Sequence, residues 1–173
     1  MKAALVVVVF FAASAFAQDQ AAVTASEAAC GPKSVQFDAT EDATQHPTPQ
    51  PEPGKALVYI VQDLGEVQCS GCALTKVGLD GTWMGANQGS SYTFFPADPG
   101  ERHLCVNWQS RLGWRSRAFA MANFTAEAGH VYYFHTRISV SRYIYVFDLE
   151  PINSDEGKYL VASSALSVSH PKK

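Results

Sequence analysis

The sequence predicts an all-β fold: an antiparallel β-sandwich of about seven to eight strands, with one short helix near the C-terminus. Two observations favour this fold. From residue 54 onward, short apolar segments follow one another at close spacing, separated by turn sequences that contain Gly, Pro or Asp. The chain also contains seven Tyr and ten Phe residues, which suit the half-buried surface of a pleated strand. A small β-barrel is the alternative architecture, since it produces the same pattern.

Eight segments have the length and composition of strands. The pair Asp80-Gly81 separates the second from the third, and because such a pair adopts positive φ readily, it predicts a two-residue hairpin. The general architecture expected is similar to that of immunoglobulin and transthyretin domains. The predicted strands are residues 56–62, 74–79, 82–86, 91–95, 101–108, 118–126, 130–138 and 143–149.

A helix is expected after the last of these strands. Ser154 is a favourable N-cap residue, and Asp155 and Glu156 suit the positive end of a helix dipole. Apolar residues then follow at helical spacing. Residues 164–173 are expected to return to an extended tail.

The N-terminus has the three parts of a secretory signal peptide. Lys2 supplies the positive charge, residues 3–13 form an apolar run, and Ala15-Phe16-Ala17 is a small-x-small cleavage sequence. A membrane-spanning helix needs about 20 apolar residues, so the run is too short to be an anchor. We therefore expect residues 1–17 to be removed and the mature protein to be periplasmic or secreted, with no transmembrane anchor.

Residues 18–53 are expected to form a flexible spacer ahead of a single β domain at 54–173. The spacer carries six acidic residues against Lys33 alone, and prolines alternate with other residues at 47–53. Such spacing favours an extended, semi-rigid chain. Residues 34–38 alternate apolar and polar side chains and are expected to form a short strand. The net charge of −3 argues against nucleic-acid binding.

Five short sequences of the domain, taken in order, carry a resemblance to a known family. Among them are Gly-Lys-Ala-Leu-Val-Tyr and Ala-Gly-His-Val-Tyr-Tyr-Phe, and their positions are 54–59, 77–85, 91–92, 99–103 and 128–134. Their order and spacing resemble a bacterial family of exported proteins, the domain of unknown function two-eight-four-six. The resemblance covers roughly residues 54–160. It implies a small β domain outside the inner membrane and implies no catalytic residue.

Four cysteines remain after signal removal: Cys30, Cys69, Cys72 and Cys105. An even number of cysteines in an exported chain predicts disulfides, and four allow three pairings. We favour Cys105 bonded to Cys69 or Cys72, with Cys30 bonded to the other. Such bridges would hold the spacer and the Cys69 loop against the sheet.

The same cysteines suggest an alternative function. Cys69-Ser70-Gly71-Cys72 has the C-x-x-C spacing of thiol–disulfide oxidoreductases, although it lies in a loop between strands and not at a helix N-terminus. A zinc site formed by both of these cysteines with His103 and Cys105 has suitable ligand types, but oxidation competes for the thiols. No G-x-S-x-G or H-E-x-x-H sequence is present. The main expectation is therefore no catalytic residue, no metal and no cofactor.

The strongest candidate for a binding surface is the connection at residues 109–117. It combines three arginines with a tryptophan, residue types that serve interfaces and hold anionic groups. We expect a non-catalytic envelope or secreted module whose partner is an anionic cell-envelope component, another envelope protein or the acidic spacer itself. The candidate residues are Arg111, Trp114, Arg115 and Arg117.

We predict that the exported protein begins at Gln18, because the cleavage sequence ends at Ala17. Mass spectrometry of the intact protein from the periplasm or medium tests this. Retention of Met1, or an acyl group on Cys30, would contradict it.

Overall fold

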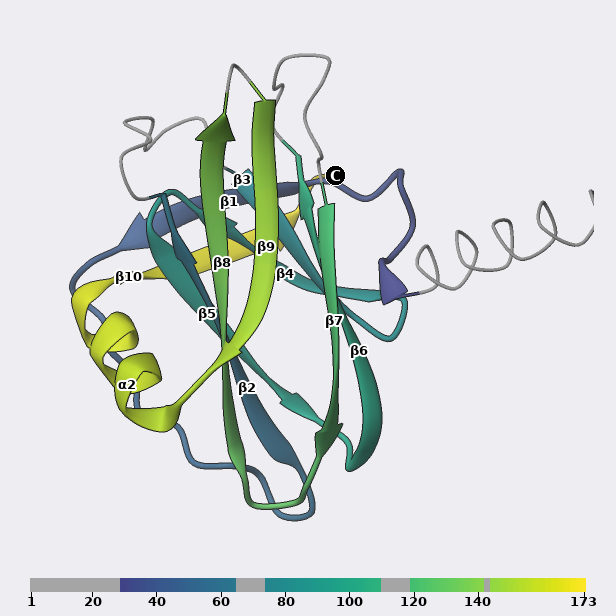
Figure 1. Ribbon diagram of the computed structural model, residues 1–173, viewed down its shortest axis with the longest axis vertical. Helices are drawn as coiled ribbons and strands as arrows, with labels where there is room; N and C mark the ends of the chain where they lie inside the picture. Colours follow the sequence, from purple (N-terminus) through teal and green to yellow (C-terminus); the bar gives the residue numbers. More distant parts are fainter. Residues whose placement is uncertain (1–28, 65–73, 110–118, 142–143) are drawn as a thin grey trace, which may run out of the picture.

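The computed structural model describes residues 29–64, 74–109, 119–141 and 144–173. Two β-sheets pack face to face in this part of the chain, and one short helix lies near the C-terminus (Figure 1). The predicted mostly-β sandwich is therefore confirmed. The described strands form two open sheets rather than a closed barrel, so the alternative architecture is wrong.

The described residues form ten strands, more than the seven to eight expected from the sequence. Beyond the eight strands predicted for the domain are the last strand, β10, and the first, β1, which corresponds to the short strand expected in the spacer. The elements are β1 Phe37–Asp42, β2 Ala56–Asp63, β3 Leu74–Leu79, β4 Thr82–Gln88, β5 Ser91–Ala97, β6 Gly100–Trp108, β7 Phe119–Ala126, β8 Val131–Ser141, β9 Ile144–Ile152, α2 Ser154–Ser163 and β10 Ala165–Pro171.

One sheet has six strands in the order β1-β10-β5-β2-β8-β9, and the other has four in the order β4-β3-β6-β7. Most neighbours are antiparallel, as predicted, but β2 pairs with β8 and β10 with β5 in parallel. These parallel neighbours are distant in sequence. No short hairpin joins them, so nothing in the connection requires an antiparallel pair.

Alternate residues of the strands build the core between the sheets. Val58 and Ile60 of β2 are fully buried in a cluster with Leu104 and Val106 of β6. The intervening residues of β2 point to the opposite face of the six-stranded sheet, where Tyr59 packs in a second cluster with Leu160 and others near α2. This alternation explains why β2 reads as a continuous apolar segment: it is covered on both faces.

The segment predicted to be a flexible spacer takes part in the fold from residue 29 onward. The short strand expected at 34–38 is present a few residues later as β1, which pairs antiparallel with β10. The C-terminal segment expected to be an extended tail is β10 itself. Each of these strands supplies the other's hydrogen-bonding partner. The folded unit therefore begins well before residue 54.

Cys30 forms a disulfide with Cys105 of β6, so our preferred pairing of Cys105 with Cys69 or Cys72 is wrong. The bond joins residues 75 apart in sequence, a separation for which chain-entropy estimates give a stabilisation of about 4 kcal/mol. Neighbouring contacts hold the same segment on the outer face of the four-stranded sheet. Lys76 Nζ donates to the Val35 carbonyl at 2.9 Å, and Trp83 Nε1 donates to the Pro32 carbonyl at 2.9 Å.

Side chains of β10 join the two sheets along one edge. Ser169 Oγ accepts a hydrogen bond from Ala86 N of β4 at 3.0 Å, and Ser167 Oγ donates to the Ala86 carbonyl at 2.7 Å. Ser167 Oγ also accepts from Gln88 N at 3.2 Å. Three backbone groups at the outer edge of β4 are therefore satisfied by the other sheet rather than by a further strand.

The local predictions at the hairpin and the helix hold with one correction. Asp80 and Gly81 have φ values of 48° and 83°, as a two-residue turn between β3 and β4 requires. The N-cap of α2 is Asn153 rather than Ser154: its Oδ1 accepts from the backbone N–H of Asp155 and of Glu156, both at 3.0 Å. Ser154 lies one residue too late for this role because it is already helical.

We predict that Gly157→Ala destabilises the protein, although alanine normally favours a helix by about 1 kcal/mol. A Cβ at residue 157 would overlap the ring of Tyr133, on which α2 rests. Urea unfolding should show a loss of about 1–3 kcal/mol from overpacking. Lys158→Ala, an exposed change in the same helix, is the control and should cost less than about 0.5 kcal/mol. A more stable Gly157→Ala variant would show that α2 does not pack closely on Tyr133.

Candidate functional site

A groove lies between β7 and β9, the outermost strands of the two sheets. The strands run side by side on the face that Figure 1 presents, and the space between them measures about 490 Å³. This edge is opposite to the one that β10 joins to β4. The groove is lined by Phe119, Ala120, Met121, Phe147, Asp148, Leu149 and Glu150.

The alternation of side chains along the two strands determines the chemistry of the groove. Phe147 and Leu149 point inward, are buried in the core and form the floor. Phe147 meets the ring of Trp108 edge-on, with 5.1 Å between ring centroids, and this contact holds it in place. Phe119 and Met121 point outward from β7 and remain 44% and 38% exposed. Large apolar side chains with this much exposure mark the groove as a surface suited to contact with another molecule.

Two carboxylates give the groove a negative rim. Asp148 and Glu150 alternate with the floor residues of β9 and are exposed. Neither forms an ion pair with another residue in the described part of the chain. The groove therefore combines an apolar floor with two exposed carboxylates at its rim, of which Asp148 lies directly opposite Arg137 of β8.

The backbones of both strands are available on the groove side. Among the described strands, β7 hydrogen-bonds only to β6, and β9 only to β8. Each strand thus presents one row of backbone N–H and C=O groups that no other described strand satisfies. Such an edge is a template on which another extended chain can pair.

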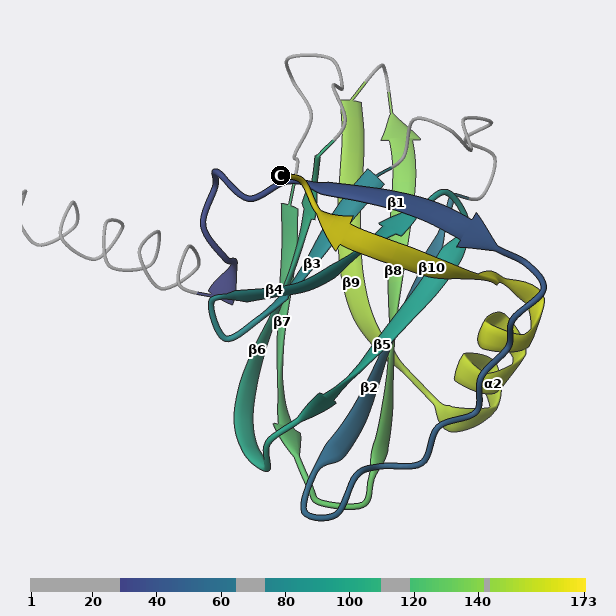
Figure 2. The same ribbon diagram turned by 180° about the vertical axis from the view of Figure 1, so that it is seen from behind.

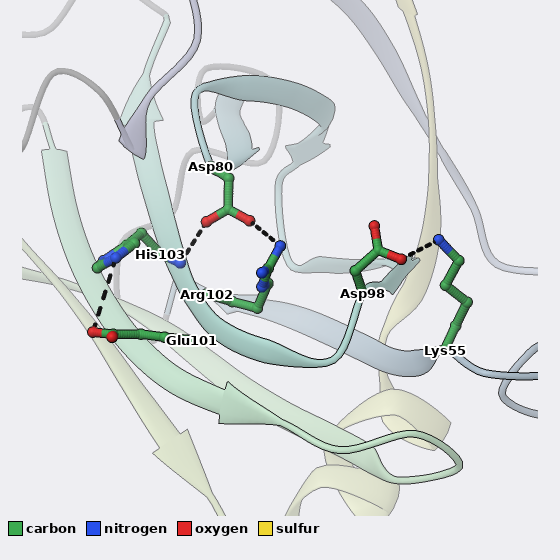
Figure 3. A network of polar contacts seen from close by, with 6 residues as sticks. All are labelled: Lys55, Asp80, Asp98, Glu101, Arg102 and His103. Carbon is green, nitrogen blue, oxygen red and sulfur yellow. Dashed lines mark hydrogen bonds and ion pairs between the residues drawn. The ribbon is translucent and has the colours of Figure 1, made fainter.

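A second group of polar residues, shown in Figure 3, has a structural role. Asp80 accepts hydrogen bonds from Arg102 Nη1 at 3.0 Å and from His103 N at 2.8 Å, which ties the β3–β4 turn to β6. Lys55 binds Asp98, and this contact holds the pKa of the Asp98 carboxyl below its usual value. These contacts join turns and strands of the fold to one another, and the group therefore has a structural role.

Most sequence-predicted site residues lie outside the part of the chain that the structure describes. These are Cys69 and Cys72 of the C-x-x-C sequence, and Arg111, Trp114, Arg115 and Arg117 of the expected binding loop. Cys30 and Cys105 are described and are joined to each other. The zinc set that included Cys105 is therefore wrong, because a disulfide sulfur is not a thiolate ligand. Within the described residues, no cluster of three or more His, Cys, Asp or Glu side chains has a geometry suited to a metal.

Sequence reasoning missed the groove, although β7 contains a signal for it. In Phe-Ala-Met-Ala the large apolar residues alternate with alanine. The structure places Ala120 and Ala122 against the core and directs Phe119 and Met121 outward. Small residues facing inward at the edge of the sheet leave room beside Phe147, which opens the groove.

The chain has no identified relatives. No family model, curated protein or solved structure matches it. Membership in the exported family named above therefore stays a prediction. Within the described ranges, no helix combines the length and the apolar character needed to cross a membrane.

His135 is a buried titratable group on the outer face of the six-stranded sheet. The residue is 5% exposed, and Arg137 Nε donates to its Nδ1 at 3.3 Å. Burial, with a smaller contribution from nearby Arg137, lowers the pKa of His135 below its usual value. Acidic groups of three other elements, Asp63, Glu150 and Glu156, oppose this shift only in part.

We predict that His135 makes the folded state less stable in mildly acidic solution. The unfolded chain, with an ordinary histidine pKa of about 6.5, takes up a proton before the folded protein does. The stabilisation is therefore complete above about pH 6.5 and is lost as the pH falls through the lowered pKa of the folded protein. Urea unfolding between pH 7.5 and pH 5 measures the slope.

His135→Gln should flatten this slope, because it removes the buried imidazole. An identical pH dependence in the parent and the His135→Gln variant would show that this side chain is accessible to protons in the folded state.

Proposed function

We propose that this protein is an exported, non-catalytic binding module that holds an extended segment of a partner protein along the β7–β9 groove. One observation carries the proposal: a groove with an apolar floor and an acidic rim lies between two strand edges that no described strand occupies. The partner segment that fits is an extended chain in which lysine or arginine alternates with apolar residues.

The strand edges support an extended rather than a helical partner. An extended chain that adds to the edge of a sheet gains main-chain hydrogen bonds, and its alternate side chains enter pockets on one face. The described groove residues of β9, 147–150, cover about 10 Å of an extended chain at about 3.3 Å per residue. The site therefore accommodates about three to four residues of the partner.

The side chains that line the groove support a partner segment that contains both apolar and basic residues. Apolar side chains of an added strand would cover Phe119 and Met121 and contact the floor at Phe147. Basic side chains on the opposite face of the same strand would lie near Asp148 and Glu150. This charge match favours a basic segment over an acidic one, and salt weakens it because both carboxylates are exposed.

The N-terminal region supports an envelope or extracellular setting for this binding. Its signal-like sequence and the Cys30–Cys105 disulfide both suit an oxidising compartment. Asp148 and Glu150 are the only titratable side chains that line the described groove, and both are exposed. We therefore assign Asp148 and Glu150 to recognition and not to catalysis. The partner is accordingly a protein exported to the same compartment.

We predict that the mature protein binds a fluorescein-labelled ten-residue peptide of alternating Lys and Val, measured by fluorescence anisotropy. It should not bind the peptide of alternating Glu and Val, nor a Lys-Val peptide N-methylated at alternate residues, which cannot pair with a strand. Met121→Thr should weaken binding about tenfold through the loss of apolar contact. Met84→Thr is the matched control because Met84 has a similar exposure on β4, away from the groove.

The charge requirement is tested with Asp148→Asn combined with Glu150→Gln. Binding of the Lys-Val peptide at low salt should weaken about fivefold to tenfold, and the difference from the parent should shrink at 0.5 M NaCl. The control is Glu41→Gln combined with Glu52→Gln, which removes two exposed acids elsewhere. Equal affinity of parent, Met121→Thr and double-acid variants would overturn the proposed function.

A further inference from the structure

A polar layer crosses the otherwise apolar core at one end of the sandwich. In the six-stranded sheet, Gln62 of β2 pairs with Thr136 of β8, and Ser91 of β5 lies one position beyond the Val61–Tyr92 pair. In the four-stranded sheet, Asn87 of β4 pairs with Thr75 of β3. All five side chains are almost completely buried. We call Gln62, Thr75, Asn87, Ser91 and Thr136 the polar layer.

The two halves of the layer face each other across the core. Asn87 Nδ2 donates to the Ile60 carbonyl of the opposite sheet at 3.1 Å and lies 3.5 Å from the Ser91 carbonyl. Gln62 Nε2 donates to the Gly89 carbonyl at 2.7 Å. Residues 60, 62, 87 and 91 are therefore direct neighbours, and the strand pairings place residues 75 and 136 beside them.

Four oxygen atoms of the layer have no hydrogen-bonding partner among the described residues. They are Thr75 Oγ1, Asn87 Oδ1, Ser91 Oγ and Thr136 Oγ1. A buried polar atom without a partner is destabilising, because it has given up its hydrogen bonds to water and gained none in the fold. Native proteins satisfy such atoms, and where no protein group is available they do so with buried water.

We propose that the polar layer is a water-binding site in which ordered water molecules bridge the two sheets. The chemistry selects water over a metal ion, because the four atoms belong to three hydroxyls and one amide and none carries a charge. It also selects a ligand that both donates and accepts, since hydroxyls do both while the Asn87 oxygen only accepts. A buried water makes about three hydrogen bonds, so one or two molecules satisfy the four atoms.

The site accounts for a polar interruption in the core. Positions 62, 75, 87, 91 and 136 face the interior, where a sandwich normally places apolar residues. Hydrogen bonds through water are directional, so they align the two sheets at this end, whereas apolar contacts alone permit sliding. Thr136 of the polar layer is paired across the strands with Leu149, which lies in the floor of the β7–β9 groove. The proposed water is therefore directly behind that floor.

Substitution of the threonines by valine gives results of opposite sign for a hydrated and a dry layer. If water binds the hydroxyl, Thr75→Val and Thr136→Val each remove one of its partners, and the melting temperature should fall by about 3 °C or more. If the layer is dry, valine of the same shape replaces an unsatisfied hydroxyl, and the melting temperature should rise. Thr125→Val, an exposed change on β7, is the control and should leave it nearly unchanged.

A crystal structure of the mature protein at about 1.5 Å tests the site directly. We expect one or two ordered waters within 3.2 Å of these oxygen atoms, and loss or displacement of a water in Thr136→Val. An empty layer, a bound cation in place of water, or a rise in melting temperature for both valine variants would overturn the proposal.

Discussion

The hydrogen bonds between β10 and the edge of β4 are the constraint on which the rest of the architecture depends. Through Ser167 and Ser169 the last strand of the chain satisfies the outer edge of the four-stranded sheet and joins that sheet to the other one. The sandwich is thereby closed along one side. At the other edge of the four-stranded sheet, β7 lies beside β9 without pairing with it (Figures 1 and 2). The β7–β9 groove lies between these two strands.

The outer faces of the two sheets are covered in different ways, which makes the groove distinctive. Tyr59 and Tyr133 stack on the six-stranded sheet near α2, and burial raises the pKa of Tyr59 to about 12. On the four-stranded sheet, the segment after Ala29 is joined to Cys105 by the Cys30 disulfide, and Trp83 donates a hydrogen bond to the Pro32 carbonyl of the same segment. With these faces shielded, Phe119 and Met121 are the large apolar side chains left exposed beside a groove. This distribution supports the proposed binding at the β7–β9 edge.

The candidate site was less predictable than the fold. Sequence reasoning directed attention to residues with distinctive chemistry, the C-x-x-C cysteines and the arginine-rich connection, because such residues are recognisable without a structure. The groove consists of ordinary residues, such as Met121 and Asp148, whose significance depends on two strand edges meeting without pairing. The polar layer is similar: Thr75 and Thr136 are unremarkable strand residues until the packing of the sheets buries both hydroxyls.

The sequence by itself determined the local elements: nine of the ten described strands, the Asp80-Gly81 turn and the helix after residue 153. These depend on the backbone preferences of residues that are neighbours in the chain. Only the tertiary structure decided the pairing of β1 with β10, the parallel contact of β2 with β8, the Cys30–Cys105 bond and the groove. Each of these joins segments far apart in sequence. Because any strand edge offers the same backbone hydrogen bonds, the choice among partners rests on which side chains the complete core buries.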